Sequence, residues 1–169
     1  MIRLVDFNDH WKDFFSKEKN MLLDALRGQK VLGVEHIGAT SVVLCKTCGT
    51  IDLLCIIPSK IEFITIKNLL VSKGYQYLQS MSNDECYTFA RRNDKNQIVS
   101  ITRVIEQASV FHKEVVLFKG YLRESDRNVR DYNNFRKALL ENCGGDAKEY
   151  QKVKQNYIRS ILHDFCEVK

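Results

Sequence analysis

The segment of sequence that decides the fold reads His-Ile-Gly-Ala-Thr-Ser at residues 36–41, and Asp52 follows eleven residues after Ser41. The pattern predicts a strand, a glycine turn with two hydroxyls, and a second strand that carries one carboxylate. Glycine lets the backbone approach a ligand closely, and hydroxyls and amides at a helix start can hold phosphate oxygens. A neighbouring carboxylate can hold magnesium against those phosphates. The segment fits nucleoside triphosphate chemistry, and it fits equally a helix cap formed by Thr40 and Ser41.

The hydrophobic spacing around this segment predicts further strands and helices. Asn8 or Asp9 caps a first helix. The run at residues 51–57 is almost continuously apolar, as expected of a strand covered on both faces. Ser59 caps the next helix and Gly74 ends it. That helix carries the apolar residues Ile61, Ile64, Leu69 and Leu70. The other expected strands span residues 31–37, 75–78, 86–91 and 97–105, and the later helices span residues 111–124, 126–141 and 146–166.

Strands in the first part of the chain and helices in the last predict the α+β class, with a mixed β-sheet, flanking helices and a C-terminal helical sub-domain. The length fits one hydrophobic core, so we expect a single domain over residues 1–169. Residues 1–110 form the sheet part and residues 111–169 the helical part. The clearest break between two helices is Asn-Cys-Gly-Gly at residues 142–145.

Composition sets few limits on function. The formal net charge of +5 permits a polyanionic partner without requiring one, and an ordinary solvated surface explains it as well. No apolar run approaches the roughly 20 residues of a membrane span, so we expect no membrane partner. The six cysteines are scattered and the amino terminus lacks signal-peptide features, so we expect reduced thiols and a cytoplasmic location. Nucleic acid is a conceivable partner, but no dense basic stripe interleaved with aromatic residues supports it.

Four stretches, in the right order over nearly the whole chain, resemble the GrpB family. His-Ile-Gly-Ala-Thr-Ser-Val at residues 36–42, followed by Ile-Asp at residues 51–52, resembles its signature. Phe-Lys-Gly-Tyr-Leu-Arg at residues 118–123 is similar to its Phe-Arg-Asp-Tyr-Leu-Arg. Further matching positions are Trp11, Phe15, Glu18, Lys19, Leu22, Tyr150, Lys154, Tyr157 and Ile158. The resemblance implies the nucleotidyltransferase fold of the DNA polymerase beta superfamily, a nucleoside triphosphate as ligand, and magnesium as cofactor.

The loop after the signature departs from the family. Where the family reads Val-Pro-Gly-Leu-Ala-Ala-Lys-Pro, residues 42–49 read Val-Val-Leu-Cys-Lys-Thr-Cys-Gly. Cys48 stands in the position of the family lysine. Lys46 is two residues away and substitutes for that lysine only if the loop bends differently.

The expected metal site is incomplete. In the superfamily, carboxylates two apart on a strand point to the same face and hold two divalent ions. Here Asp52 is present, but the partner position is Leu54. One carboxylate holds magnesium weakly unless phosphates or another acid complete the shell. The candidate acids are Glu35, Asp84, Glu85 and Asp94. The strand at residues 99–103 also lacks the His-x-His of the family.

Several other polar residues have two readings. His36 either contacts a nucleotide or is hydrogen-bonded and orients the loop. Lys154 and Arg123 meet the phosphates if the helical part closes over the sheet, or else they are solvated neighbours of aromatic core residues. The pair Cys45-x-x-Cys48 is a zinc or redox site, or two incidental thiols. The Arg91–Arg92 pair reads as a solvated hairpin end, with phosphate binding as the alternative.

Two functions of different class follow. The first is an enzyme that transfers a nucleotidyl group from a nucleoside triphosphate to an unknown acceptor. The second is a non-catalytic relative that binds a nucleotide, another anion or a protein through the same cleft, and the missing second carboxylate and histidines favour it. The expected site comprises Asp52 as catalytic and magnesium-binding residue, with Gly38, Thr40, Ser41, His36, Arg123 and Lys154 at the phosphates.

Overall fold

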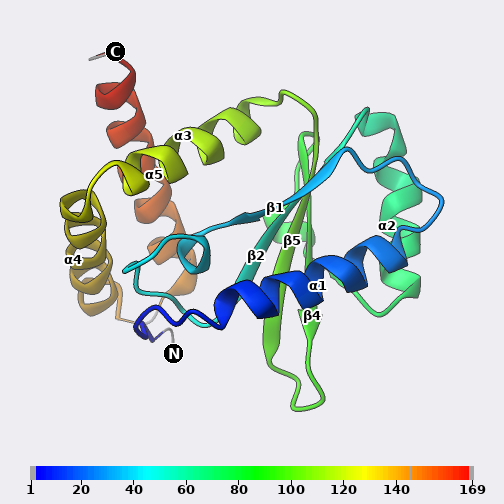
Figure 1. Ribbon diagram of the computed structural model, residues 1–169, viewed down its shortest axis with the longest axis horizontal. Helices are drawn as coiled ribbons and strands as arrows, with labels where there is room; N and C mark the ends of the chain where they lie inside the picture. The colour runs from blue at the N-terminus through cyan, green and yellow to red at the C-terminus, as the bar shows by residue number, and fades with distance from the viewer. Residues whose placement is uncertain (1–2, 145, 168–169) are drawn as a thin grey trace.

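A computed structural model of the protein describes residues 3–144 and 146–167, so Gly145 of the predicted break and residues 1–2 and 168–169 lie outside the description. The described chain forms a central sheet with helices on both faces (Figure 1). The strands are β1 (Gly33–Ile37), β2 (Ile51–Ile57), β3 (Gln76–Tyr77), β4 (Cys86–Arg92) and β5 (Ile98–Glu106). The helices are α1 (Trp11–Ala25), α2 (Phe63–Ser72), α3 (Val110–Glu124), α4 (Asp126–Asn142) and α5 (Ala147–Glu167), with short 3₁₀ turns η1 (Ala39–Ser41), η2 (Lys60–Glu62) and η3 (Gln79–Met81).

The sheet is mixed, as predicted. Its strand order is β1-β2-β5-β4-β3. The central strands β2 and β5 run parallel, and every other neighbouring pair runs antiparallel. A parallel pair needs a long crossover connection, and the segment with α2, β3 and β4 supplies it. The two strands that carry the candidate site, β1 and β2, therefore lie at one edge of the sheet and next to its centre.

The side chains of β2 alternate between two buried layers. Leu53, Cys55 and Ile57 pack with residues of α1 and α2 in the largest apolar cluster. Leu54 and Ile56 point to the opposite face, where α3 covers them. This double coverage explains the continuous apolar run in the sequence. Asp52 belongs to the same face as Leu54, because side chains two apart on a strand share a face.

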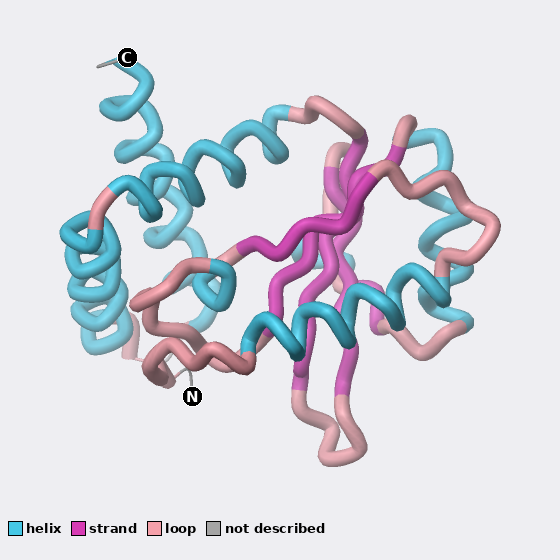
Figure 2. Tube along the Cα trace, viewed as in Figure 1, coloured by secondary structure: helices cyan, strands magenta, loops and turns pink. Residues whose placement is uncertain are grey.

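The helical part packs on that second face, beyond the end of β2 (Figure 2). A third apolar cluster joins α3, α4 and α5 to the loop after η1 through Val42 and Cys45. Ser125 accounts for the sharp α3–α4 corner, since its hydroxyl accepts a hydrogen bond from the N–H of Asn128 at the start of α4. The loop of the signature and the three last helices therefore enclose space between them.

The structure corrects several sequence-based details. The residue before α1 is His10, not Asn8 or Asp9, although the Asn8 side chain accepts a hydrogen bond from the His10 N–H. Ile61 lies in η2, before α2, and is 87% exposed, and Ile64 is 66% exposed because α2 buries a different face. The residues that α2 does bury are Phe63, Ile66 and Leu70.

Arg91 is not solvated either. It is paired with the buried Glu18 of α1, which also accepts a hydrogen bond from Ser100. This network ties α1 to the sheet on the face away from the helical part. Among the described residues, no helix has the length and apolar character that a membrane crossing requires.

Candidate functional site

Gly38 and Asp52 touch across neighbouring strands. Gly38 directly follows β1, whose last residue, Ile37, is paired with Asp52. Its φ of 71° and ψ of −172° form a combination that almost only glycine adopts. A Cβ at this position would lie 2.5 Å from Oδ2 of Asp52. Glycine is therefore required twice here, by the backbone angles and by the carboxylate that lies against it.

The Asp52 carboxylate has a cationic partner within the protein. Nη1 of Arg103 on β5 donates to Oδ1 of Asp52 at 2.9 Å. Arg103 stands opposite Leu54 in the parallel β2–β5 register. The two side chains are 22% and 28% exposed, so water screens this ion pair less than it screens a surface pair. Sequence reasoning missed Arg103, because nothing local to its strand indicates which residue of β2 it meets.

The side chains around Asp52 do not fit magnesium well. Magnesium takes oxygen ligands in a nearly ideal octahedron. Leu54, where a second carboxylate is expected, is fully buried in an apolar cluster with Ile56 and Ile105. Within residues 3–144 and 146–167, no group of three or more His, Cys, Asp or Glu side chains can hold a metal ion. The remaining ligands would have to come from water or from a bound substrate.

None of the acids considered as a second ligand joins Asp52. Glu35 on β1 stands opposite Leu54, and its Oε1 lies 3.4 Å from Nε2 of His112 on α3. The turn before β4 and the β4–β5 hairpin carry the other three acids. These exposed residues are Asp84, Glu85 and Asp94. The first two precede Cys86, which pairs with Ile105 and thus lies at the opposite end of β5 from the neighbour of Asp52.

The two hydroxyls of the glycine turn are engaged inside the turn itself. Thr40 is buried, and its Oγ1 lies 2.9 Å from Nε2 of His36. The Ser41 hydroxyl donates to the carbonyl of Gly38 at 2.8 Å. The His36 ring also stacks on Phe15 of α1, with centroids 4.5 Å apart. These contacts are those of a turn stabilised by its own polar groups.

His36 is a neutral, structural histidine in this setting. Burial, together with the positive charge of Lys119, lowers the pKa of His36 to about 4. A neutral ring can keep both contacts: the hydrogen bond with Thr40, in one of its two tautomers, and the stacking on Phe15. Of the two readings of this residue, orientation of the loop is the one that these contacts support.

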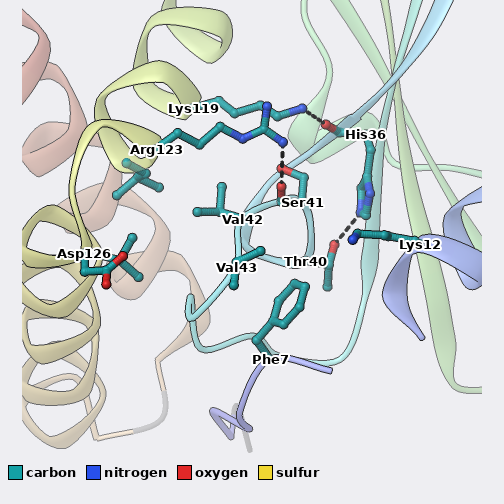
Figure 3. Close-up of a pocket in the computed structure, with 12 residues that line it drawn as sticks. Phe7, Lys12, His36, Thr40, Ser41, Val42, Val43, Lys119, Arg123 and Asp126 are labelled. Atoms are coloured by element: carbon teal, nitrogen blue, oxygen red, sulfur yellow. Dashed lines mark hydrogen bonds between the residues drawn. The ribbon is translucent and has the colours of Figure 1, made fainter. Parts of the chain in front are cut away.

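Two basic residues of α3 reach over the same turn (Figure 3). Lys119 Nζ donates to the carbonyl of His36 at 2.6 Å, and Arg123 Nη2 donates to the carbonyl of Ser41 at 3.1 Å. Burial and the nearby Arg123 lower the pKa of Lys119. The two side chains lie one helical turn apart on α3, so they clamp the helical part onto the signature loop. They border a pocket of about 420 Å³ that also contains Lys12 of α1.

A larger cavity of about 720 Å³ lies on the other side of the turn, between the sheet and the helical part. Gly38, Asp52 and Arg103 contribute from the sheet side, and Lys154 contributes from α5. Its basic lining residues are Arg3, Arg103, Lys119, Arg136 and Lys154, and its acidic ones are Asp52 and Glu114. The charged residues of the cavity wall are therefore predominantly cationic.

Lys154 faces this cavity from α5. Burial lowers the pKa of Lys154 to about 8, while the charge of Asp52 opposes the shift and those of Arg136 and Arg103 add to it. Its Nζ lies 5.7 Å from the centre of the Tyr150 ring. No carboxylate of the described residues pairs with it within 4 Å. Its charge is thus desolvated, attracted by Asp52 and repelled by Arg136 and Arg103, and a bound anion would stabilise it.

Arg136 of α4 organises the loop that departs from the family. It is buried and donates to the carbonyl of Lys46 and, at 3.1 Å, to the hydroxyl of Tyr150. Its other donors reach the thiols of Cys45 and Cys48 at 4.0 and 3.7 Å. A guanidinium in contact with both thiols disfavours a zinc site, because Arg136 lies where the two cysteines would bind the zinc ion. Lys46, the suggested substitute for the family lysine, is paired with Asp6 instead.

The structure divides the predicted site residues between the two hollows. Gly38, Asp52 and Lys154 line the larger cavity. The smaller pocket is lined by the other predicted residues, which are His36, Thr40, Ser41 and Arg123. The η1 turn separates the two sets, and among the described residues only Val42, Lys119 and Leu122 border both hollows. Sequence reasoning missed the cationic residues Arg103, Lys119 and Arg136.

Comparison with solved structures identifies the fold. GrpB from Enterococcus faecalis superimposes with a TM-score of 0.81 at 20% identity, and 96% of each chain is covered. The Cid1 poly(U) polymerase, solved with MgGTP bound, superimposes with a TM-score of 0.57 at 12% identity. The match spans 80% of this chain but only 44% of that polymerase. The fold is therefore of the nucleotidyltransferase type.

Sequence comparison identifies the family. The Glutamate-rich protein GrpB of Alkalihalophilus pseudofirmus is 26% identical over 164 residues, which are 95% of this chain and 94% of that protein. A UPF0157 protein of Streptomyces coelicolor is 24% identical over 160 residues, 95% of this chain and 82% of that protein. The sequence profile described as "GrpB protein" matches residues 1–164. The chain belongs to the GrpB family.

Proposed function

We propose that this protein binds a phosphate-bearing small molecule, such as a nucleotide, in the larger cavity and does not transfer a nucleotidyl group. The observation that carries the proposal is the charge of the cavity wall, which has five basic side chains against two carboxylates. One of those carboxylates, Asp52, is paired with Arg103, and the other, Glu114, lies 3.7 Å from Arg159.

Three of the wall cations lack a carboxylate partner within the described chain. Arg136 contacts only neutral groups and the ring of Tyr132, at 5.2 Å. Lys119 donates to a backbone carbonyl, and the Lys154 ammonium group lies 5.7 Å from the centre of the Tyr150 ring. Keeping three positive charges in a partly buried space is unfavourable unless an anion joins them. A phosphate group supplies charge and acceptor oxygens together.

The size and the remaining walls of the cavity suit a nucleotide. Its volume of about 720 Å³ is in the ordinary range for small-molecule sites. Apolar side chains of α3 and α5, among them Phe111, Phe118 and Ile158, also line the cavity. A phosphate bound at the basic wall would leave this apolar part for a base or another flat group. The likeness to a polymerase that was solved with MgGTP bound agrees with this choice of ligand.

The transfer reaction is the weaker reading. Nucleotidyl transfer in the two-metal manner needs carboxylates that hold the ions against the phosphates. Here Leu54 replaces one of them and Arg103 neutralises the other, Asp52. The ligand would therefore meet a preformed cationic wall in place of bound magnesium.

Isothermal titration calorimetry of AMP, ADP and ATP in the presence of EDTA tests this function. We expect saturable binding by the wild type, and about tenfold weaker binding or worse by Lys154→Met, because a partly buried charge-assisted contact is lost. Lys152→Met is the matched control, since Lys152 is an exposed lysine on the same helix outside the cavity and its loss should leave the affinity unchanged.

Two results would contradict the proposal. One is the absence of binding heat with all three nucleotides for a folded wild-type protein, in which case Lys154→Met would have no effect either. The other is pyrophosphate release from a nucleoside triphosphate that Asp52→Ala abolishes, which would restore the transferase reading.

A further inference from the structure

Arg103 and Asp52 line the larger cavity from the sheet side. The contacts of this ion pair limit which phosphate ligands the cavity can bind. Oδ1 of Asp52 accepts from Arg103 at 2.9 Å. Oδ2 lies on the side of Gly38, where even a methyl group would be only 2.5 Å from it. The guanidinium therefore occupies one oxygen of a carboxylate that is only 28% exposed, and a divalent ion on Asp52 would have to compete with Arg103.

The neighbouring positions on the sheet reinforce this exclusion. In the row next to Asp52, Glu35, Leu54 and Arg103 stand side by side on β1, β2 and β5. Leu54 offers no ligand, and Glu35 is turned toward His112 of α3. Next to Asp52 this row thus supplies a leucine and a permanent cation, and the one carboxylate of the row, Glu35, lies against His112.

We propose that Arg103 serves as the built-in cation of this cavity, in the space that a divalent ion on Asp52 would need, and that the ligand is a phosphomonoester bound without metal. This inference rests on the proposed function, which it narrows from phosphate-bearing molecules in general to one class.

The chemistry of the guanidinium supports the choice. A guanidinium has five N–H donors in a planar fork, and the described contacts of Arg103 use one of them, on Asp52. The remaining donors can bind two oxygens of one phosphate in a bidentate manner. Lys154 faces the same space from α5, so a terminal phosphate can be held from two sides.

The metal ion separates a monoester from a magnesium triphosphate, whose overall charge is similar. A phosphomonoester carries about two negative charges at neutral pH, which the wall cations Lys119, Arg136 and Lys154 can neutralise without a metal ion. A magnesium-bound triphosphate brings a hard cation that prefers carboxylate and water oxygens. Next to Arg103, Arg136 and Lys154 that cation meets repulsion and no free carboxylate.

Two sets of binding measurements test the proposal. Manganese binding, followed by electron paramagnetic resonance, is compared in the wild type, Leu54→Asp, and Leu54→Asp/Arg103→Ala. AMP and ATP affinities are measured calorimetrically with EDTA and with excess magnesium in the wild type, Arg103→Ala and Arg103→Lys. The lysine variant keeps the charge next to Asp52 and so guards against loss of folding in the alanine variant.

We expect no saturable manganese site in the wild type and a new site in the double variant, where two carboxylates share a face without the guanidinium. AMP should bind equally with EDTA and magnesium, and more tightly than magnesium-bound ATP. Arg103→Ala should weaken AMP binding about tenfold, and Arg103→Lys by less, because the bidentate contact is lost and the charge kept.

Each contrary result has its own meaning. A wild-type manganese site that Asp52→Asn removes would overturn the role of Arg103. Tighter binding of magnesium-bound ATP than of AMP would overturn the ligand class and leave phosphate binding intact. If neither nucleotide binds the folded wild type, the proposed function itself fails, and the manganese comparison still tests Arg103 separately.

Discussion

The two sides of the η1 turn use similar residues in different ways. On the side of the smaller pocket, the polar groups satisfy one another: His36 with Thr40, Ser41 with Gly38, and Arg123 with the carbonyl of Ser41. On the side of the larger cavity, Lys154 and Arg136 have no carboxylate partner within the described chain, and Arg103 is paired with Asp52. On the first side these polar groups are hydrogen-bonded within the protein. On the second side, positive charges remain without a carboxylate partner among the described residues.

This difference separates stability from binding. A hydrogen bond that is closed inside the protein contributes to folding, but its groups are not available to a ligand without the cost of breaking it. The stretch with the most recognisable sequence therefore acts mainly as a rigid support. The residues that can hold an anion come from β5, α4 and α5, which surround that support. Changes on the turn side should alter stability, and changes on the cavity side should alter affinity.

Gly38→Ala should have the largest effect on stability, because Gly38 begins the η1 turn although it also borders the larger cavity. The new Cβ would lie 2.5 Å from the Asp52 carboxylate, at backbone angles that almost only glycine adopts. We expect a loss of roughly 3 kcal/mol or more in the free energy of unfolding, measured with urea. Gly74→Ala is the control, because Gly74 has φ 86° and no atom within 4 Å of the added Cβ. It should cost only about 1 kcal/mol, from the left-handed backbone.

Relief of the Gly38→Ala defect by Asp52→Ala would show that the close approach of the carboxylate causes part of the loss. Equal costs for Gly38→Ala and Gly74→Ala would contradict the described contact.

Acid pH should weaken the turn through His36. The pKa of His36 is lowered to about 4 from the usual 6.5, so the unfolded chain takes up the proton first as the pH falls. Stability that is present above pH 6.5 should be lost as the pH falls toward 4, by roughly 2 kcal/mol after allowance for solvent screening. His36→Gln cannot titrate, so urea unfolding at several pH values should show a correspondingly shallower dependence. Identical pH profiles would argue against a buried, neutral His36.

Thr40→Val should lower the stability of the protein without changing its affinity for AMP. It removes a buried hydroxyl and leaves the His36 ring nitrogen unpaired, which should cost about 1–2 kcal/mol of stability. The affinity for AMP should stay within about twofold, because Thr40 does not line the larger cavity. Thr40→Ser keeps the hydroxyl and should lose less stability. A folded Thr40→Val protein that no longer binds AMP would place the phosphate on the turn after all.

Much of the fold could be predicted from local sequence. β2 begins and ends at the predicted residues, and α3, α4, β4 and β5 deviate by one residue at most at each end. These elements have strong periodic or continuous apolar patterns with caps such as Ser125. The errors arose where tertiary packing decides. Ile61 and Ile64 look like core residues, but the sheet lies against the face of α2 with Phe63 and Ile66.

The site was predictable only in part. The pairing of Gly38 with Asp52 follows from adjacent strands, and one lysine of the cavity, Lys154, was expected at the phosphates. Arg103 is an arginine within a strand, and only the β2–β5 register shows that it meets Asp52. Arg136 is 88 residues from Cys48 in the chain, and no local pattern links the two. Long-range charge pairing of this kind depends on topology, which single-sequence patterns do not specify.

The most direct test of the central claim is the affinity of Asp52→Asn for AMP in the presence of EDTA, compared with the wild type by calorimetry. If the cavity binds phosphate through its own cations, removal of the Asp52 charge frees Arg103 and reduces repulsion. The affinity should then rise about fivefold, or roughly 1 kcal/mol. If Asp52 instead holds a metal ion for the ligand, AMP should bind the wild type only with magnesium, and Asp52→Asn should abolish that binding. This second result would contradict the account.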